Sequence, residues 1–283
     1  ILNEPSVHAF EGHLIGTHAP GLTGEANFFK AVHHQNMVIG QTYDLLKSRN
    51  SKFHVGSSYT TFPVRTEGKT DEDIVARDVF DAAWNGVFFD ALFKGKYPDI
   101  LRERIAPYVE PSDMSVVKRN LDFIGLQHYS PTYVKPTIDN DLGTTGTEPP
   151  VRFKRTDMGW PIEPEGFYEC LKSFQDEYLP KSIVITENGA AMPDKMVDGS
   201  VKDFDRIEYF ESYLAQVERA IEDGVKVDGY FAWSFMDNFE WAFGLAKRFG
   251  IVHVDYDTLK RTPKASYQWW QERLEEERDE IAA

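Results

Sequence analysis

Two glutamates stand just after short apolar runs, and each lies beside an asparagine. Glu4 follows Ile1-Leu2-Asn3, and Glu187 follows Ile183-Val184-Ile185-Thr186 and precedes Asn188. The C-terminal ends of the strands of a parallel α/β barrel meet at one face, so both carboxylates are expected to line one pocket. Cleavage of a glycosidic bond needs such a pair, because one carboxyl protonates the leaving oxygen while the other attacks the sugar or activates water. Either glutamate alone is more often a surface residue, and it is the matched pair that favours catalysis.

Apolar strands and amphipathic helices alternate around these glutamates. The patterns predict strands over 53–58, 121–129, 183–185 and 227–235, a strand stub at 1–2, and helices over 24–47, 71–93, 164–178 and 203–223. A capping-box-like start at Thr70 and Asp73 opens the second helix, and a last helix is expected with Thr262 as N-cap and Pro263 in its first turn. The alternation predicts right-handed βαβ units and a parallel sheet. Residues 136–155 are predicted to be a long loop, and 1–283 to be one catalytic-domain portion.

The two glutamate motifs resemble those of family 1 glycoside hydrolases, the β-glucosidase family. The chain starts inside that family's Thr-x-Asn-Glu-Pro motif as Ile1 to Pro5, and Ile185 to Gly189 matches its Ile/Val-Thr-Glu-Asn-Gly motif. The resemblance extends along essentially the whole chain. It implies that Glu4 is the acid/base and Glu187 the nucleophile of a retaining β-glycosidase, and that Asn3 hydrogen-bonds the sugar 2-hydroxyl.

A third match runs from Trp233 to Trp241, as Trp-Ser-Phe-Met-Asp-Asn-Phe-Glu-Trp. The resemblance implies that Glu240 binds the 4- and 6-hydroxyls of the sugar, that Trp241 binds the 3-hydroxyl, and that Trp233 is the stacking floor beneath the ring. Phe249 continues the match within Lys247-Arg248-Phe249-Gly250, where it lines the sugar pocket or simply belongs to the core.

The strand around residue 129 resembles the family segment Asp-Phe-x-Gly-x-Asn-Tyr-Tyr. Tyr129 then hydrogen-bonds the nucleophile and helps to keep it ionised. Gln127 replaces the usual asparagine and is still placed in the pocket, whereas His128 replaces a tyrosine and is expected to point away in a structural role. Trp160, within Met158-Gly159-Trp160, is either a platform for the leaving group or an exposed loop side chain.

The fold that this resemblance implies is α/β, a (β/α)8 TIM barrel. The motifs align from the end of strand 4 through strand and helix 8, and strands 1 to 3 have no counterpart here. In the family, the loops of those strands carry a Gln and a His-Trp pair that bind the sugar and an Arg that supports the nucleophile. We therefore expect the N-terminal part of the barrel, from a separate chain or from sequence beyond this one, to be a partner, and activity only in the complete barrel.

Three functional hypotheses fit this set of residues. The first is a retaining exo-β-glycosidase acting on terminal β-D-glucosyl residues of β-glucosides or short β-linked oligosaccharides, with galactose and fucose left open. The second is an inactive carbohydrate-binding or regulatory protein on the same fold, which the presence of both glutamates disfavours. The third is a 6-phospho-β-glycosidase, which the negative charge of Glu240 disfavours.

Composition narrows the partners further. Lys and Arg total 31 against 46 Asp and Glu, a net charge of −15, which disfavours nucleic-acid binding. No apolar run approaches the length of a membrane span or a signal peptide, and the lone Cys170 and absent glycosylation acceptors lean toward a cytoplasmic protein. His33 and His34 are adjacent on a helix and point apart by about 100°, so we expect neither a metal nor a cofactor.

Overall fold

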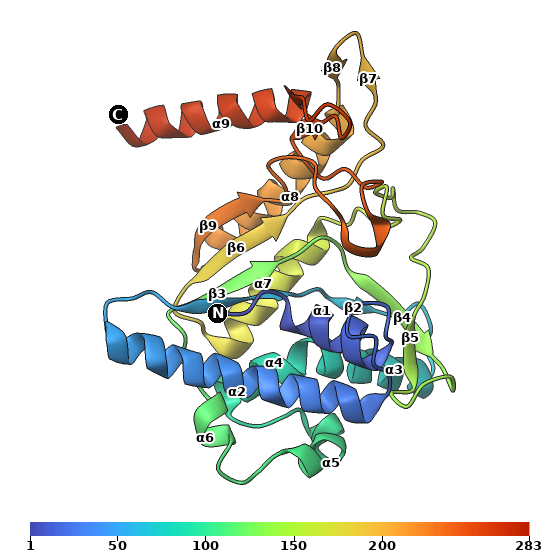
Figure 1. Ribbon diagram of the computed structural model, residues 1–283, viewed down its shortest axis with the longest axis vertical. Helices are drawn as coiled ribbons and strands as arrows, with labels where there is room; N and C mark the ends of the chain where they lie inside the picture. Colours follow the sequence, from blue (N-terminus) through green and yellow to red (C-terminus); the bar gives the residue numbers. More distant parts are fainter. Residues whose placement is uncertain (283) are drawn as a thin grey trace.

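A parallel sheet is the centre of the computed structural model, which describes residues 1–282. Its strands follow one another in chain order as β1 (Gly56–Thr60), β3 (Phe123–Gln127), β6 (Ile183–Asn188) and β9 (Val227–Ala232) (Figure 1). A bridge between Asn3 and Ser58 adds the N-terminal stub beside β1. The parallel sheet and its stub are therefore present as the sequence predicted.

Helices connect each strand to the next. The helix α2 (Glu25–Arg49) precedes β1, α7 (Glu165–Tyr178) joins β3 to β6, and α8 (Phe204–Glu222) joins β6 to β9. The connection from β1 to β3 contains α3 (Asp71–Asp81), η2 (Ala82–Gly86), α4 (Val87–Phe89), η3 (Asp90–Lys94), η4 (Asp99–Leu101), α5 (Arg102–Ile105), η5 (Ala106–Tyr108) and α6 (Met114–Val117). The last helix, α9 (Ala265–Ala282), lies at the opposite end of the molecule from α2 (Figure 1).

The core lies between the sheet and the helices that cover it. Leu126 of β3 and Ile185 of β6 are fully buried, and they pack in one apolar cluster with Phe167 of α7 and Phe210 of α8. Phe231 of β9 is 61% exposed instead. The strand β9 is also an edge strand in the described part of the chain, with no strand on its other side.

Helical structure departs from the expected pattern in two places. The pair α1 (Pro5–Ala9) and η1 (Phe10–Leu14) forms a short helical segment that periodicity did not predict. The helix expected over 71–93 does begin with the predicted capping box of Thr70 and Asp73, but two π-helical segments interrupt it. Such segments depend on packing and are not encoded by an apolar repeat.

Two predictions in loops and caps were wrong. Thr262 does not cap the last helix, because it lies in β11 (Arg261–Pro263), which pairs with β10 (Val252–Val254), and α9 begins at Ala265. Within the predicted loop 136–155, β5 (Thr144–Gly146) pairs with β4 (Thr132–Pro136), which also pairs with β2 (Val64–Arg65). A small hairpin of β7 (Met196–Val197) and β8 (Ser200–Val201) follows β6. Strand partners far along the chain decide these elements, and local patterns do not show them.

No helix within residues 1–282 has both the length and the apolar character that crossing a membrane requires.

Candidate active site

A row of hydrogen-bonded side chains crosses the C-terminal ends of adjacent strands. The Gln127 amide donates to Glu187 Oε1 and to Asn3 Oδ1, at 2.7 Å each. Its own Oε1 lies 2.9 Å from the Thr60 hydroxyl, which also contacts the Glu4 carboxylate. Two glutamates that are 183 positions apart in the sequence therefore meet in one polar cluster, with only Thr60 and Gln127 between them.

Strand register creates this row. Gln127 of β3 pairs with Thr60 of β1 on one side and with Glu187 of β6 on the other. The pairing of β3 with β6 shifts register between Leu126 and Gln127. Glu4 follows the residue that bridges to Ser58, and its backbone has a positive φ of 49°. Positive φ is uncommon for a residue other than glycine and often marks a functional position.

Tyr129 holds the second oxygen of the Glu187 carboxylate. Its hydroxyl donates to Glu187 Oε2 at 2.5 Å. Burial raises the pKa of Glu187 to about 7, the Tyr129 hydrogen bond opposes that rise, and the negative charges of Glu4 and Glu240 add to it. The phenol therefore favours the ionised form as expected, but in this chain burial outweighs it.

The pKa of Glu4 is also raised, mainly by burial. A hydrogen bond from Thr60 and the charge of His18 act in the opposite direction. Both carboxyl groups are therefore held in surroundings that disfavour charge, as is common for groups that exchange protons in catalysis.

Three aromatic rings form a cluster that includes Tyr129, the residue that holds the Glu187 carboxylate. Tyr129 and Trp160 have ring centroids 5.4 Å apart, and Phe249 lies 6.0 Å from Tyr129 and 6.1 Å from Trp160. Phe249 is only 1% exposed, so it supports the other two rings as a core residue does. Trp160 is half-buried against the tyrosine that holds Glu187, which places it at the edge of the candidate site.

The loop after β9 places the third group of predicted residues. Trp233 comes directly after the strand, and its backbone N–H donates to the Asn188 carbonyl at 2.8 Å. Glu240 is half-buried, and burial and the charge of Glu4 raise its pKa. Trp241 is 63% exposed and has a positive φ of 42°. The negative charge of Glu240 also contributes to the raised pKa of Glu187.

Two site residues escaped the sequence analysis. Thr60 lay beyond the predicted end of its strand, although a polar side chain at the C-terminal end of a strand was a usable sign. His18 stacks on Trp241 with ring centroids 5.5 Å apart, and its charge acts on Glu4. His18 lies in an irregular loop rich in glycine and proline, where no spacing rule identifies it.

The remaining candidates are placed away from this cluster. His128 is fully buried, stacks on Phe167 at 4.9 Å, and its Nδ1 is 3.0 Å from the Thr61 carbonyl oxygen, which fits the expected structural role. His33 lies between the Tyr97 hydroxyl and the Asp113 carboxylate, at 2.8 and 2.9 Å. Among the residues described, no three His, Cys, Asp or Glu side chains gather as metal ligands.

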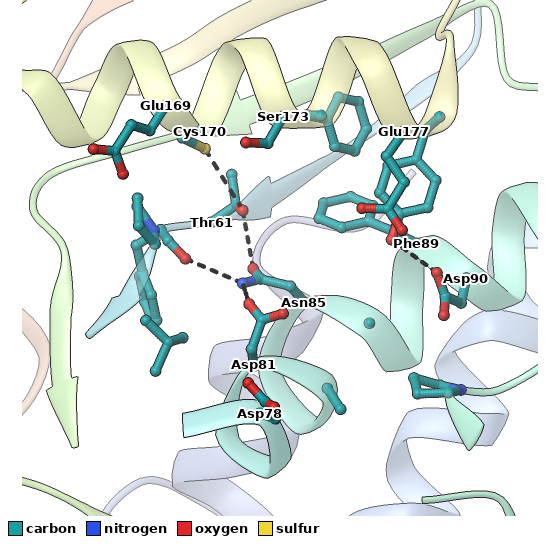
Figure 2. Close-up of a pocket in the computed structure, with 18 of the residues that line it drawn as sticks. Thr61, Asp78, Asp81, Asn85, Phe89, Asp90, Glu169, Cys170, Ser173 and Glu177 are labelled. Atoms are coloured by element: carbon teal, nitrogen blue, oxygen red, sulfur yellow. Dashed lines mark hydrogen bonds between the residues drawn. The ribbon is translucent and has the colours of Figure 1, made fainter. Parts of the chain in front are cut away.

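Cys170 lines a cavity of about 400 Å³ that is separate from the candidate site (Figure 2). Its buried thiol is 3.8 Å from the Thr61 hydroxyl, which donates to Asn85 at 2.9 Å, and Asn85 donates to Asp81 at 2.8 Å. Burial raises the pKa of the thiol to about 12. The cysteine is therefore a buried thiol of low reactivity.

Comparison with known proteins identifies the class that this sheet and this site define. Residues 1–279 match the family described as Glycosyl hydrolase family 1. The chain is 38% identical to a 1,4-beta-D-glucan glucohydrolase of Thermotoga neapolitana and to Beta-glucosidase A of Thermotoga maritima, each over 95% of this chain and 61% of the relative. It is also 38% identical to a bifunctional beta-D-glucosidase/beta-D-fucosidase of Bifidobacterium breve, over 95% of this chain and 62% of that protein.

Solved structures agree with the sequence relatives. The family 1 β-glucosidase from Thermotoga maritima superimposes with a TM-score of 0.91 at 36% identity, covering 97% of this chain and 63% of that one. The same organism's β-glucosidase in complex with deoxynojirimycin superimposes with a TM-score of 0.89 at 37% identity, covering 95% of this chain and 62% of that one.

The chain belongs to glycoside hydrolase family 1. Its fold is the C-terminal part of a (β/α)8 barrel, which confirms the predicted fold class. The chain spans somewhat more than three fifths of the length of the relatives that it matches, 61% in the first of them.

Proposed function

We propose that this chain supplies both catalytic carboxylates of a retaining exo-β-glycosidase whose first substrate class is β-D-glucosides. The observation that carries the proposal is the hydrogen-bonded row, in which Tyr129 and Gln127 hold the two oxygens of Glu187 while Thr60 links the row to Glu4. A carboxylate fixed at both oxygens is oriented for attack, and a second carboxyl in the same cluster is available for proton transfer.

The proposed reaction is a double displacement. Glu187 attacks the anomeric carbon while Glu4 gives its proton to the departing glycosidic oxygen, which leaves a covalent glycosyl-enzyme and an ionised Glu4. Glu4 then takes a proton from water, the resulting hydroxide attacks the anomeric carbon, and Glu187 leaves as carboxylate. Two inversions at one carbon retain the β configuration of the sugar.

This reaction requires an ionised Glu187, whereas burial in this chain raises its pKa to about 7. A positive charge near Glu187 would lower that pKa, since an opposite charge favours the ionised carboxylate. We propose that the N-terminal part of the barrel is the partner of this chain and supplies that charge, through the arginine that the family resemblance places there. In the complete barrel Glu187 would then be ionised and ready to attack, while Glu4 would keep the proton that it gives to the leaving oxygen.

Recognition of the sugar is proposed to come from four polar or aromatic side chains. Asn3 would bind the 2-hydroxyl, Trp241 the 3-hydroxyl and Glu240 the 4- and 6-hydroxyls, with Trp233 beneath the ring. The relatives named as glucosidases, a glucan glucohydrolase and a glucosidase/fucosidase support a β-glucosyl or β-fucosyl group cut from a short oligosaccharide. Trp160, beside Tyr129, would contact the leaving group.

Removal of the proposed nucleophile tests this function. In the barrel assembled from this chain and an N-terminal fragment of a relative, Glu187→Gly should abolish hydrolysis of 4-nitrophenyl β-D-glucoside, because no glycosyl-enzyme can form. Added azide should restore turnover and yield the α-glycosyl azide, since a small anion fits the vacated space and attacks once.

Glu148→Gly is the matched control, because Glu148 is an exposed loop residue paired only with Arg155. This variant should keep its activity and should gain none from azide. Near-wild-type hydrolysis by Glu187→Gly would show that another residue is the nucleophile.

A further inference from the structure

Six charged side chains form a network of ion pairs, with no net charge, that includes residues of the loops after β6 and β9. Three are basic and three acidic, and all but one are at most 1% exposed: Arg206, Lys264, Arg248, Asp194, Asp203 and Asp237. Arg248 is the exception, with a side chain that is 22% exposed. A buried network with equal numbers of each sign is stable only while every partner stays in place, because a lost partner leaves an uncompensated charge in a medium of low polarity.

Lys264 is the member that joins two loops of the site. Its ammonium contacts the carboxylate of Asp194 and donates to Asp237 Oδ1 at 2.8 Å. Asp194 lies in the loop that follows the Glu187 strand, and Asp237 lies three residues before Glu240. One fully buried ammonium therefore connects the segment of the proposed nucleophile to the segment of the sugar-binding residues.

Asp237 is held from four directions. Besides Lys264, Oδ1 accepts the Gly250 N–H at 3.1 Å, while Oδ2 accepts from Arg248 at 2.5 Å and from the Val254 N–H at 3.3 Å. With four donors on two oxygens, this carboxylate has one well-defined position. The backbone between Asp237 and Glu240 starts from that fixed point.

Two glycines mark close backbone approaches in these segments. A Cβ on Gly189, two residues after Glu187, would lie 1.9 Å from the Trp233 carbonyl oxygen. A Cβ on Gly250 would lie 2.1 Å from the Asp237 backbone nitrogen. The Glu187 segment is therefore in backbone contact with Trp233, four residues before Asp237, and the Asp237 segment is in backbone contact with Gly250. A shift of the Asp237 segment would thus reach the Glu187 segment through Trp233.

We propose that Lys264 is a positioning residue, which sets Glu240 and Trp241 relative to Glu187 by fixing Asp194 and Asp237 together. The inference rests on the proposed function, and it adds a residue that contacts neither the sugar nor the carboxylates of Glu4 and Glu187. The alternative is that the network contributes only to overall stability.

Lys264→Met in the assembled barrel distinguishes these roles. Methionine has a similar length without the charge, so Asp194 and Asp237 lose their common partner. We expect kcat/KM for 4-nitrophenyl β-D-glucoside to fall about 100-fold, as a misplacement of about 1 Å can cause. The fall for the β-D-xyloside, which lacks the hydroxymethyl group proposed to reach Glu240, should be about tenfold smaller.

Lys47→Met is the matched control. Lys47 also pairs with an aspartate, donating to Asp122 at 2.8 Å, but this pair lies just before the start of β3, at the opposite end of the sheet from the site. Its loss should leave the glucoside-to-xyloside ratio unchanged. Lys264→Arg keeps the charge, so its ratio of kcat/KM for the glucoside to kcat/KM for the xyloside should lie between the ratios of Lys264→Met and the wild type. Asp194→Asn removes one arm of the bridge and should change the ratio in the same direction if Lys264→Met folds poorly.

Hydrogen–deuterium exchange supplies a readout that needs no activity. Peptides covering 234–250 should exchange faster in Lys264→Met than in Lys47→Met when stability is matched with denaturant. Equal exchange in these peptides, together with equal losses on glucoside and xyloside, would overturn the proposal and leave a purely structural role. A wild-type barrel that cleaves neither glycoside would refute the proposed function, and the exchange comparison would then decide the role of Lys264 by itself.

Discussion

Two neutral donors hold the Glu187 carboxylate: Gln127 at the end of β3 and Tyr129 just after it. Gln127 replaces the asparagine of the family pattern, yet its amide still reaches Glu187 Oε1 and also Asn3. Tyr129 donates to the other oxygen and is the contact that opposes the raised pKa of Glu187. These contacts orient the carboxylate, and the Tyr129 hydrogen bond only partly offsets the rise in its pKa that burial causes.

The pH dependence of the assembled enzyme should report the Tyr129 hydrogen bond. Tyr129→Phe removes a donor that stabilises the ionised carboxylate, so the pKa of Glu187 should rise further. The acidic limb of kcat/KM should then move to higher pH, by about 1 unit for one hydrogen bond to a charged group. The measurement is a pH–rate profile on an aryl β-glucoside.

Tyr133→Phe serves as the comparison, because Tyr133 donates to Glu163 at 2.8 Å outside the candidate site. Its acidic limb should coincide with that of the wild type. An unmoved limb in Tyr129→Phe would mean that this phenol does not act on the titrating group.

Among the elements, the contact of β6 with β9 decides how the site is assembled. The strand β6 ends in the polar residues Thr186, Glu187 and Asn188, and the turn after Glu187 lies against the backbone that follows β9. Gly189 has room only for a hydrogen toward the Trp233 carbonyl. The glycine of the Thr-Glu-Asn-Gly motif therefore has a packing reason, which is the close approach of two strand ends.

A methyl group at this position should separate the two ends. For Gly189→Ala we expect the free energy of unfolding to fall by about 1–3 kcal/mol, the usual cost of overpacking, and kcat/KM to fall with it. Urea unfolding and aryl-glucoside kinetics of the assembled barrel would measure both. Gly146→Ala is the control, because its added Cβ meets nothing within 4 Å. Equal stability of the two variants would argue against a close approach at Gly189.

For the whole molecule, the dominant feature is a sheet with two open edges. The N-terminal stub and β9 each have a neighbour on one side only within the described residues. Near the β9 edge, Phe231, Phe235 and Phe239 are 61%, 59% and 68% exposed. Apolar rings along an unpaired strand edge favour association with another chain.

The isolated chain should therefore aggregate, remain loosely packed or dimerise through these edges. Each buried apolar side chain contributes about 1.5–3 kcal/mol, against a typical net stability of about 5–15 kcal/mol, so a few missing burials remove most of the margin. Size-exclusion chromatography and thermal unfolding, with and without an N-terminal fragment, would test this. A soluble monomer of 32.5 kDa that melts sharply alone would contradict it.

The sequence by itself determined the parallel sheet and the two glutamates at strand ends. Apolar runs mark buried strands locally, and Glu4 and Glu187 follow such runs directly. Tyr129 could be predicted in the same way, because its position on the strand and the family motif agree. These predictions depended on neighbouring residues, for which local pattern is sufficient.

Only the tertiary structure decided which distant side chains complete the site. Thr60 enters through strand register, and His18 through an irregular loop that stacks on Trp241. Lys264 was not singled out by any sequence pattern, and it lies after a strand pair and contacts Asp194, 70 positions earlier. The physical reason is that hydrogen bonds and ion pairs join groups by distance in space, and chain spacing determines that distance only within one helix or strand.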